Sequence, residues 1–217
     1  MAREERKALF ENIDIYPVTC ERLSGGRTDL DVLEGLIEGG AKIVQLREKH
    51  LCQRDFFRLA EKFRERTAKA GMLLIINDRV DVALGVGADG VHLGQNDLPL
   101  GAARKIAPDL LIGVSTHNLE QGLRAQKEGA DYVNIGPIFS TQTKEGVEHF
   151  LGPKEICAIA PRLAIAFTVM GGIKEANIRQ VLEAGARKIA VVTALTRAED
   201  IARAVRTFRK IIGEWGK

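Results

Sequence analysis

The segment VQLREK at residues 44–49 carries a first group of side chains suited to chemistry. Side chains alternate between the two faces of a strand, so a strand here would place Gln45, Arg47 and Lys49 on one face. Two cations and an amide would then share that face. Burying charge without a partner is costly, so another group must compensate the positive charge there.

Further polar groups follow four later apolar runs of the chain. In chain order they are Asn77, Asp78 and Arg79; Asp97 in HLGQND; Ser115, Thr116, His117 and Asn118; and Thr141, Thr143 and Lys144 in GPIFSTQTK. Asp78 and Asp97 would resist ionising side by side without a metal. Oxygen ligands near phosphate favour Mg²⁺, which takes one or two carboxylates and completes its shell with water and phosphate oxygens. Together with Arg47, Lys49 and Lys144, the two carboxylates indicate a magnesium-assisted pyrophosphate site.

The last two apolar runs lead into GGI (171–173) and VVTAL (191–195). In α/β barrels the loops after the seventh and eighth strands often bind phosphate through backbone N–H groups. Gly171 and Gly172 lack a Cβ atom and would let an anion approach the backbone closely. A second phosphorylated molecule is therefore expected here, although a Gly pair also marks an ordinary tight turn.

Eight strand-like apolar runs would position these groups. Four follow a Gly-Ala pair, in GGAKIVQL, GADGVHLG, GADYVNIG and GARKIAVV, and four lie at 14–18, 73–77, 110–115 and 164–170. The repeat fits a helix that ends at Gly before a strand begins. Helical periodicity separates the runs, most clearly at 54–71, and strands that alternate with helices pair in parallel. Because no GxGxxG follows the first run, we predict an α/β fold of the (β/α)8 TIM barrel type instead of an open sheet.

Length and composition agree with one barrel. The chain has 217 residues, so we predict a single domain over 1–217, with a short charged N-terminal extension over about residues 1–12. A net charge of +3 is too small to indicate a nucleic-acid partner. We find no signal-peptide run and no bilayer-length apolar segment, so we expect a cytoplasmic protein without membrane contact. Three widely spaced cysteines predict neither disulfides nor a zinc site.

The motifs resemble those of the thiamine-phosphate synthase family, also called thiamine-phosphate pyrophosphorylase. QLREK, INDRVD, ADGVHLGQND, GVSTHN, ADYVNIGPIFSTQTK and GGI occur in the family's order across almost the whole chain. The resemblance implies a transferase that joins 4-amino-2-methyl-5-hydroxymethylpyrimidine diphosphate to thiazole phosphate, giving thiamine phosphate and pyrophosphate. It implies Mg²⁺-assisted loss of pyrophosphate and capture of the pyrimidine cation by the thiazole nitrogen. No Ser-His-Asp or Cys-His pair is evident, and this displacement needs none.

The same resemblance implies roles for individual residues. The pyrimidine diphosphate would contact Gln45, Arg47, Lys49, Asn77, Ser115 and Lys144; the thiazole phosphate would contact Thr141, Gln142, Thr143, Gly172, Val192 and Thr193; and Mg²⁺ would bind Asp78 and Asp97. Arg47, Lys49 and Lys144 would be the catalytic cations, with Lys144 acting on the leaving group. Both substrates are small molecules. The sequence leaves open whether the chain forms a homo-oligomer and whether the loop at 136–152 closes over the substrates.

Simpler interpretations remain for single residues. Asp78 could pair with Arg79 or cap a helix, and Asp97 could cap the helix that follows it. We expect His92 to be a packed, hydrogen-bonded histidine and His117 to orient other groups. For the whole chain, one alternative is the related thiazole tautomerase, which generally lacks the complete diphosphate and metal set. The other is a non-catalytic barrel that binds a phosphorylated ligand.

Overall fold

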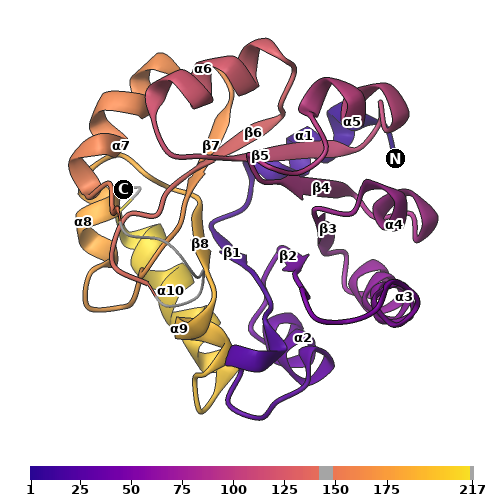
Figure 1. Cartoon of the computed structure of the whole chain (residues 1–217). Coiled ribbons are helices and arrows are strands. Elements are labelled where there is room, and N and C mark those ends of the chain that lie inside the picture. Colours follow the sequence, from indigo (N-terminus) through magenta and orange to yellow (C-terminus); the bar gives the residue numbers. More distant parts are fainter. Residues whose placement is uncertain (142–148, 216–217) are drawn as a thin grey trace.

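Parallel strands form a closed ring surrounded by helices (Figure 1). The computed structural model describes residues 1–141 and 149–215. Within these ranges the strands are β1 (Ile15–Pro17), β2 (Ile43–Leu46), β3 (Leu73–Asn77), β4 (Gly90–Leu93), β5 (Leu111–Thr116), β6 (Tyr132–Ile135), β7 (Ala166–Val169) and β8 (Ile189–Val191). They pair in the order β1-β8-β7-β6-β5-β4-β3-β2, and a parallel bridge between Val18 and Gln45 joins β1 to β2. The predicted (β/α)8 barrel is confirmed, with one strand in each predicted run.

Helices cover the outside of the ring (Figure 1). The α-helices are α1 (Arg3–Glu11), α2 (Asp29–Glu38), α3 (Gln53–Lys69), α4 (Val80–Gly85), α5 (Leu100–Ile106), α6 (Leu119–Lys127), α7 (Pro153–Ile159), α8 (Ile178–Glu183), α9 (Thr193–Thr196) and α10 (Ile201–Trp215), and the 3-10 helices are η1 (Glu21–Leu23) and η2 (Ala160–Arg162). Side chains fix some starts: Thr28 and Asp31 form a capping box at α2. In the described ranges, no helix combines the length and apolar character needed to cross a membrane.

The Gly-Ala repeat ends four helices in the same way. The glycines are Gly40, Gly87, Gly129 and Gly185, with φ between +64° and +99°. The alanine that follows each glycine donates its N–H to a carbonyl five residues back, as from Ala41 to Leu36 at 3.0 Å. This is the usual way in which a glycine with positive φ terminates a helix. The repeat therefore marks the points where the chain leaves a helix and enters the barrel, as the sequence indicates.

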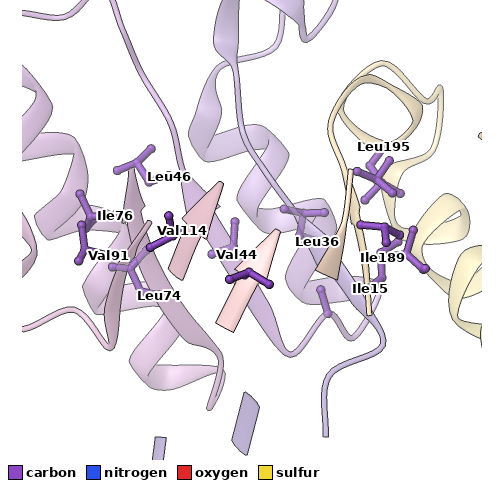
Figure 2. Packing of buried hydrophobic residues seen from close by; sticks show 14 of the residues in the cluster. Ile15, Leu36, Val44, Leu46, Leu74, Ile76, Val91, Val114, Ile189 and Leu195 are labelled. Carbon is purple, nitrogen blue, oxygen red and sulfur yellow. The ribbon is translucent and has the colours of Figure 1, made fainter. Parts of the chain in front are cut away.

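The inward side of the strands changes from apolar to polar toward their C-terminal ends. Along β2, Val44 and Leu46 pack in the layer between strands and helices, where Figure 2 shows them with other outward-facing residues. Ile43 packs inside the barrel, whereas the next inward residue, Gln45, lines a cavity. In β3, Ile75 is likewise part of the inner cluster. The apolar lower half stabilises the barrel, and the polar upper half is left for ligands.

Helix α1 closes the N-terminal end of the barrel. Its Phe10 is 2% exposed and stacks on Tyr132 of β6 with ring centroids 4.3 Å apart. At the other end of the helix, Arg3 Nε donates to the Asp131 carboxylate at 2.7 Å. The charged N-terminal extension is therefore a helix that seals the barrel floor, although its charge pattern did not indicate this.

Replacing Asp131 with Ala should destabilise the fold strongly. The carboxylate is buried and accepts hydrogen bonds from Arg104 Nη2 at 2.6 Å and from the Ile112 N–H at 2.8 Å, besides the one from Arg3. Removing it takes the acceptor from the Ile112 N–H and from Arg3 Nε, whereas Arg104 Nη2 keeps its hydrogen bond to the Gly129 carbonyl but loses its counter-charge. We expect the free energy of unfolding, measured by urea denaturation, to fall by about 3 kcal/mol or more.

The exposed Glu4 of α1, which pairs only with Lys7 in the described structure, provides the control. Glu4→Ala should change the free energy of unfolding by less than about 1 kcal/mol. An Asp131→Ala protein as stable as Glu4→Ala would contradict the assigned role of the buried carboxylate.

Candidate active site

The C-terminal ends of the strands surround a cavity of about 210 Å³. The described residues with predicted ligand contacts all line it, namely Gln45, Arg47, Lys49, Asn77, Asp78, Asp97, Ser115, Thr141, Gly172, Val192 and Thr193. The other predicted contacts, Gln142, Thr143 and Lys144, lie outside the described residues, as does the 142–148 part of the loop whose closure the sequence leaves open. Residues far apart in the sequence thus line a single cavity at one end of the barrel.

Strand β2 and the residues after it supply one amide and two cations. Gln45 is 2% exposed and donates from Nε2 to the Tyr16 hydroxyl at 2.9 Å. Lys49 Nζ contacts the Asp78 carboxylate. Arg47 Nη1 lies 3.8 Å from Cys20 Sγ, and among the described residues Arg47 forms no ion pair. Its guanidinium therefore presents a positive charge to the cavity that no described carboxylate neutralises.

Asp78 and Asp97 lie together at the ends of β3 and β4. Burial raises the pKa of Asp97 above its usual range, and the neighbouring Asp78 raises it further through a hydrogen bond and its charge. The Asp97 carboxylate accepts the Gly94 N–H at 2.6 Å, which partly opposes this rise. Asp78 has a φ of 60°, a left-handed backbone that residues other than glycine rarely adopt. Such strained residues cluster at functional sites.

Neither carboxylate serves as a helix cap. Helix α4 starts after Arg79 and helix α5 after Pro99, both without a side-chain cap hydrogen bond. Arg79 pairs with Asp81 at 2.5 Å and not with Asp78. The simpler interpretations of Asp78 and Asp97 are therefore wrong, and both side chains line the cavity.

The donor set of this carboxylate pair fits Mg²⁺. Burial first and then the neighbouring Asp78 raise the pKa of Asp97, and a divalent cation bound at this pair would favour the ionised form of both carboxylates. In the part of the chain that the structure describes, no three His, Cys, Asp or Glu side chains gather as a metal site. Mg²⁺ needs only one or two carboxylates when water and phosphate oxygens complete its shell. Asp78 and Asp97 therefore fit the ligand needs of a Mg²⁺ ion.

The loops after β7 and β8 border the cavity with backbone N–H groups. Within the described residues, no hydrogen bond is donated by the amides of Gly172, Ile173, Val192 and Thr193. The glycines also have a packing role that the sequence did not reveal. Gly172 has a φ of 63°, and a Cβ atom on it would lie 2.3 Å from the Ser140 carbonyl oxygen. The Gly pair therefore lets the segment after β6 pack closely against it. The nearby amides also remain available to an anion.

His92 of β4 lies between two hydroxyl groups. Its Nδ1 is 3.1 Å from the Tyr132 hydroxyl, and its Nε2 is 2.9 Å from Ser115 Oγ. Burial lowers the pKa of His92 to about 4, against the opposing charge of Asp97. The expectation of a packed, hydrogen-bonded histidine is confirmed. The Ser-His contact was not evident from the sequence, and it lacks the carboxylate that orients the base of a serine-hydrolase triad.

Other residues line the cavity that the sequence did not single out, among them Asn134, Met170 and Lys174. Asn134 lies in β6, where strand alternation would have placed it inward once the register was known. Lys174 directly follows GGI and adds a cation near the free amides. His117 also lines the cavity, and its Nδ1 contacts the Gly136 carbonyl at 2.6 Å, which fits the expected orienting role.

The fold and the cavity together define a class: a (β/α)8 barrel with a cationic, carboxylate-bearing cavity at the C-terminal ends of its strands. The thiamine monophosphate synthase family model matches residues 15–195, and the chain belongs to this family of thiamine-biosynthesis enzymes.

Similar proteins match the chain over nearly its full length. The thiamine-phosphate synthase of Chloroflexus aurantiacus is 46% identical over 91% of this chain and 92% of its own length. That of Caldicellulosiruptor saccharolyticus is 40% identical over 99% and 98%, respectively. Among solved structures, thiamine phosphate pyrophosphorylase from Pyrococcus furiosus is 36% identical, covers 97% of this chain and 98% of its own, and superposes with a TM-score of 0.87.

The imidazole of His92 should stay neutral well into the acidic range. Its folded pKa of about 4 lies below the ordinary value near 6.5, so the unfolded chain binds the proton more readily between these values. His92 therefore contributes stability that is lost as pH falls through this window. NMR titration of the histidine ring signals should show no protonation of His92 above about pH 5. A midpoint above pH 6 would contradict the burial argument.

Gly172→Ala should weaken binding at the free amides. The added Cβ would meet the Ser140 carbonyl, so the loop after β7 must shift. Gly185→Ala is a matched control, because Gly185 also has a positive φ of 99° but has open space where the Cβ would lie. We expect KM for a ligand bound by these amides to rise roughly tenfold or more in Gly172→Ala and to stay near wild type in Gly185→Ala. Equal behaviour of the two variants in steady-state kinetics would refute this assignment.

Proposed function

We propose that this chain condenses 4-amino-2-methyl-5-hydroxymethylpyrimidine diphosphate with thiazole phosphate to give thiamine phosphate and pyrophosphate. One observation carries the proposal: a single cavity has cations and paired carboxylates at the ends of β2 to β4 and free backbone N–H groups after β7 and β8. Two phosphorylated substrates that react with each other need two such anion sites in one cavity. The full-length similarity to proteins named thiamine-phosphate synthase gives independent support.

The diphosphate would bind at the ends of β2 to β5. Arg47 is suited to grip phosphate oxygens, because a guanidinium forms paired hydrogen bonds with them. Lys49 would exchange its contact with Asp78 for a phosphate oxygen once a metal ion bound there. A Mg²⁺ ion held by Asp78 and Asp97 would supply electrostatic stabilisation of the charge on the leaving group. The neutral hydrogen-bonding groups available to hold the pyrimidine and its diphosphate are Gln45, Asn77 and Ser115.

The thiazole phosphate would bind on the side of β7 and β8. The amides of Gly172, Val192 and Thr193 offer hydrogen bonds without adding charge. Lys174 borders the same region and would help to neutralise the phosphate. Thr141 lines the cavity from the loop after β6. Family resemblance extends this contact set to Gln142 and Thr143 and assigns Lys144 to the leaving group.

The proposed reaction requires the protein to position both substrates and to stabilise the charge of the leaving pyrophosphate. The bond between the pyrimidine methylene carbon and the diphosphate oxygen breaks, and its electron pair leaves on pyrophosphate. The thiazole nitrogen then donates its lone pair to the pyrimidine cation, forming the new carbon–nitrogen bond. No protein nucleophile takes part, and the low pKa of His92 makes it a weak base for activating Ser115. Cations around the departing pyrophosphate and a fixed thiazole would provide the rate acceleration.

Pyrophosphate release from the purified protein tests the reaction and its metal site. With both substrates, release should require Mg²⁺, stop with EDTA and be matched by thiamine phosphate. Asp78→Asn should lower kcat/KM by roughly 100-fold, because one carboxylate of the pair is lost. Asp81→Asn is the control: this exposed aspartate follows the same strand, pairs with Arg79 and does not line the cavity.

Two results would redirect the proposal. Conversion of a thiazole phosphate isomer without pyrophosphate release would indicate the tautomerase. Binding of phosphorylated ligands without any product would indicate a non-catalytic barrel. Equal losses in Asp78→Asn and Asp81→Asn would remove the metal assignment.

A further inference from the structure

A continuous chain of hydrogen bonds crosses the barrel beneath the cavity. It runs from Gln45 Nε2 to Tyr16 OH at 2.9 Å, on to Tyr132 OH at 2.8 Å, to His92 Nδ1 at 3.1 Å, and from His92 Nε2 to Ser115 Oγ at 2.9 Å. Its inner members, Tyr16, Tyr132 and His92, are at most 5% exposed. Its ends, Gln45 and Ser115, line the cavity on β2 and β5, and His92 also borders the cavity from β4. The chain therefore connects two ligand-facing groups through the interior.

The hydrogens of this chain follow one direction. Gln45 Nε2 can only donate, so Tyr16 accepts from it and passes its own hydrogen to Tyr132. Tyr132 in turn donates to His92 Nδ1, which must be the unprotonated ring nitrogen. The neutral imidazole then carries its hydrogen on Nε2 and donates it to Ser115 Oγ. With Gln45 in this orientation, the reverse direction would leave the buried Tyr16 hydrogen without an acceptor, at a cost in free energy.

The surrounding fold holds the chain in place. Tyr132 packs directly against Gly113, its register partner in β5, where a Cβ atom would lie 2.0 Å from the phenol ring. Phe10 of α1 stacks on the same Tyr132 ring. Burial raises the pKa of both Tyr16 and Tyr132, so both phenols keep their hydrogens at neutral pH. The network is thus fixed before any ligand arrives.

We infer that Tyr16, Tyr132 and His92 are positioning residues that make Ser115 a hydrogen-bond donor toward the pyrimidine diphosphate. Ser115 Oγ accepts from His92, and no described group accepts the hydrogen of Ser115 itself. That hydrogen is therefore available to an acceptor atom in the cavity, such as a phosphate oxygen or a ring nitrogen. The identity of this ligand rests on the proposed function, whereas the direction of the chain rests on the geometry.

Nitrogen-15 NMR of labelled histidine tests the direction without substrate. The signals of His92 are assigned from their loss in His92→Asn. We expect a neutral ring with its hydrogen on Nε2 and a bare Nδ1 in the wild type. Tyr132→Phe, which deletes the donor to Nδ1, should weaken this preference. A wild-type ring with its hydrogen on Nδ1 would overturn the inference. Because no turnover is needed, this result is independent of whether the proposed reaction occurs.

Kinetics test whether the chain acts through Ser115. Tyr132→Phe removes one hydroxyl and should raise KM for the pyrimidine diphosphate roughly three- to tenfold, with KM for thiazole phosphate unchanged. In a Ser115→Ala background the same substitution should have little further effect, because its target is gone. Additive losses in the double variant, or equal rises in both KM values, would overturn the inference.

A packing control separates this role from general damage to the barrel floor. Phe10→Leu alters packing beside the Tyr132 ring but keeps every hydroxyl of the chain. It should lower stability while leaving both KM values near wild type. Tyr16→Phe, which cuts the chain at another link, should reproduce the Tyr132→Phe pattern and replaces it if that variant does not fold. A Phe10→Leu protein with the same selective KM change would argue for packing and against the hydrogen bonds.

Discussion

Val18 pairs with Gln45 across the gap between β1 and β2, and this pairing turns a parallel sheet into a closed ring. Once the ring is closed, the C-terminal ends of all strands lie on one rim. Side chains alternate along each strand, so the last inward side chains face a shared space. Gln45 illustrates the link, because its backbone helps to close the ring while its side chain lines the cavity. The site is a geometric consequence of closure.

The polar groups of the cavity are already organised without a ligand. Lys49 forms an ion pair with Asp78, and partial burial together with the neighbouring Asp78 raises the pKa of Asp97. A cation that bound together with an anionic substrate would replace the Lys49–Asp78 ion pair. The carboxylates would then face the cation and Lys49 the anion, so that the charges are neutralised before and after binding. Beneath them, the tyrosines fix neutral groups whose orientation does not depend on charge. Charge neutralisation and hydrogen-bond direction thus lie in successive layers of the barrel.

The sequence predicts the upper layer of this arrangement well and the lower layer poorly. Polar residues such as Arg47 and Asp78 stand out in the sequence because they directly follow apolar strands. Residues that only fill the core would not be charged. Tyr16 and Tyr132 do not stand out, because a buried aromatic residue in a strand looks like ordinary core. Their hydroxyl contacts depend on strand register across the barrel, which strand alternation alone does not give.

Other elements show the same limit. The eight strands follow from the Gly-Ala repeat and from apolar runs, which are local signals. The contact between Ser115 and His92 joins two strands whose register is a tertiary property. The packing of Gly172 against Ser140 likewise requires knowledge of where the loop after β6 returns. Helix α1 was missed because its charged residues mask the single buried Phe10 that anchors it.

The aspartates at the starts of β4 and β6 share one arrangement at the opposite end of the barrel. Asp89 accepts from the Leu74 N–H and Arg64, and Asp131 accepts from the Ile112 N–H and Arg104. These clamps tie strands to helices without touching the cavity. Rim loops can therefore diverge in sequence while the clamps preserve folding, which is how one barrel comes to host different reactions. For laboratory evolution, this makes the rim a place to diversify and the floor a place to leave untouched.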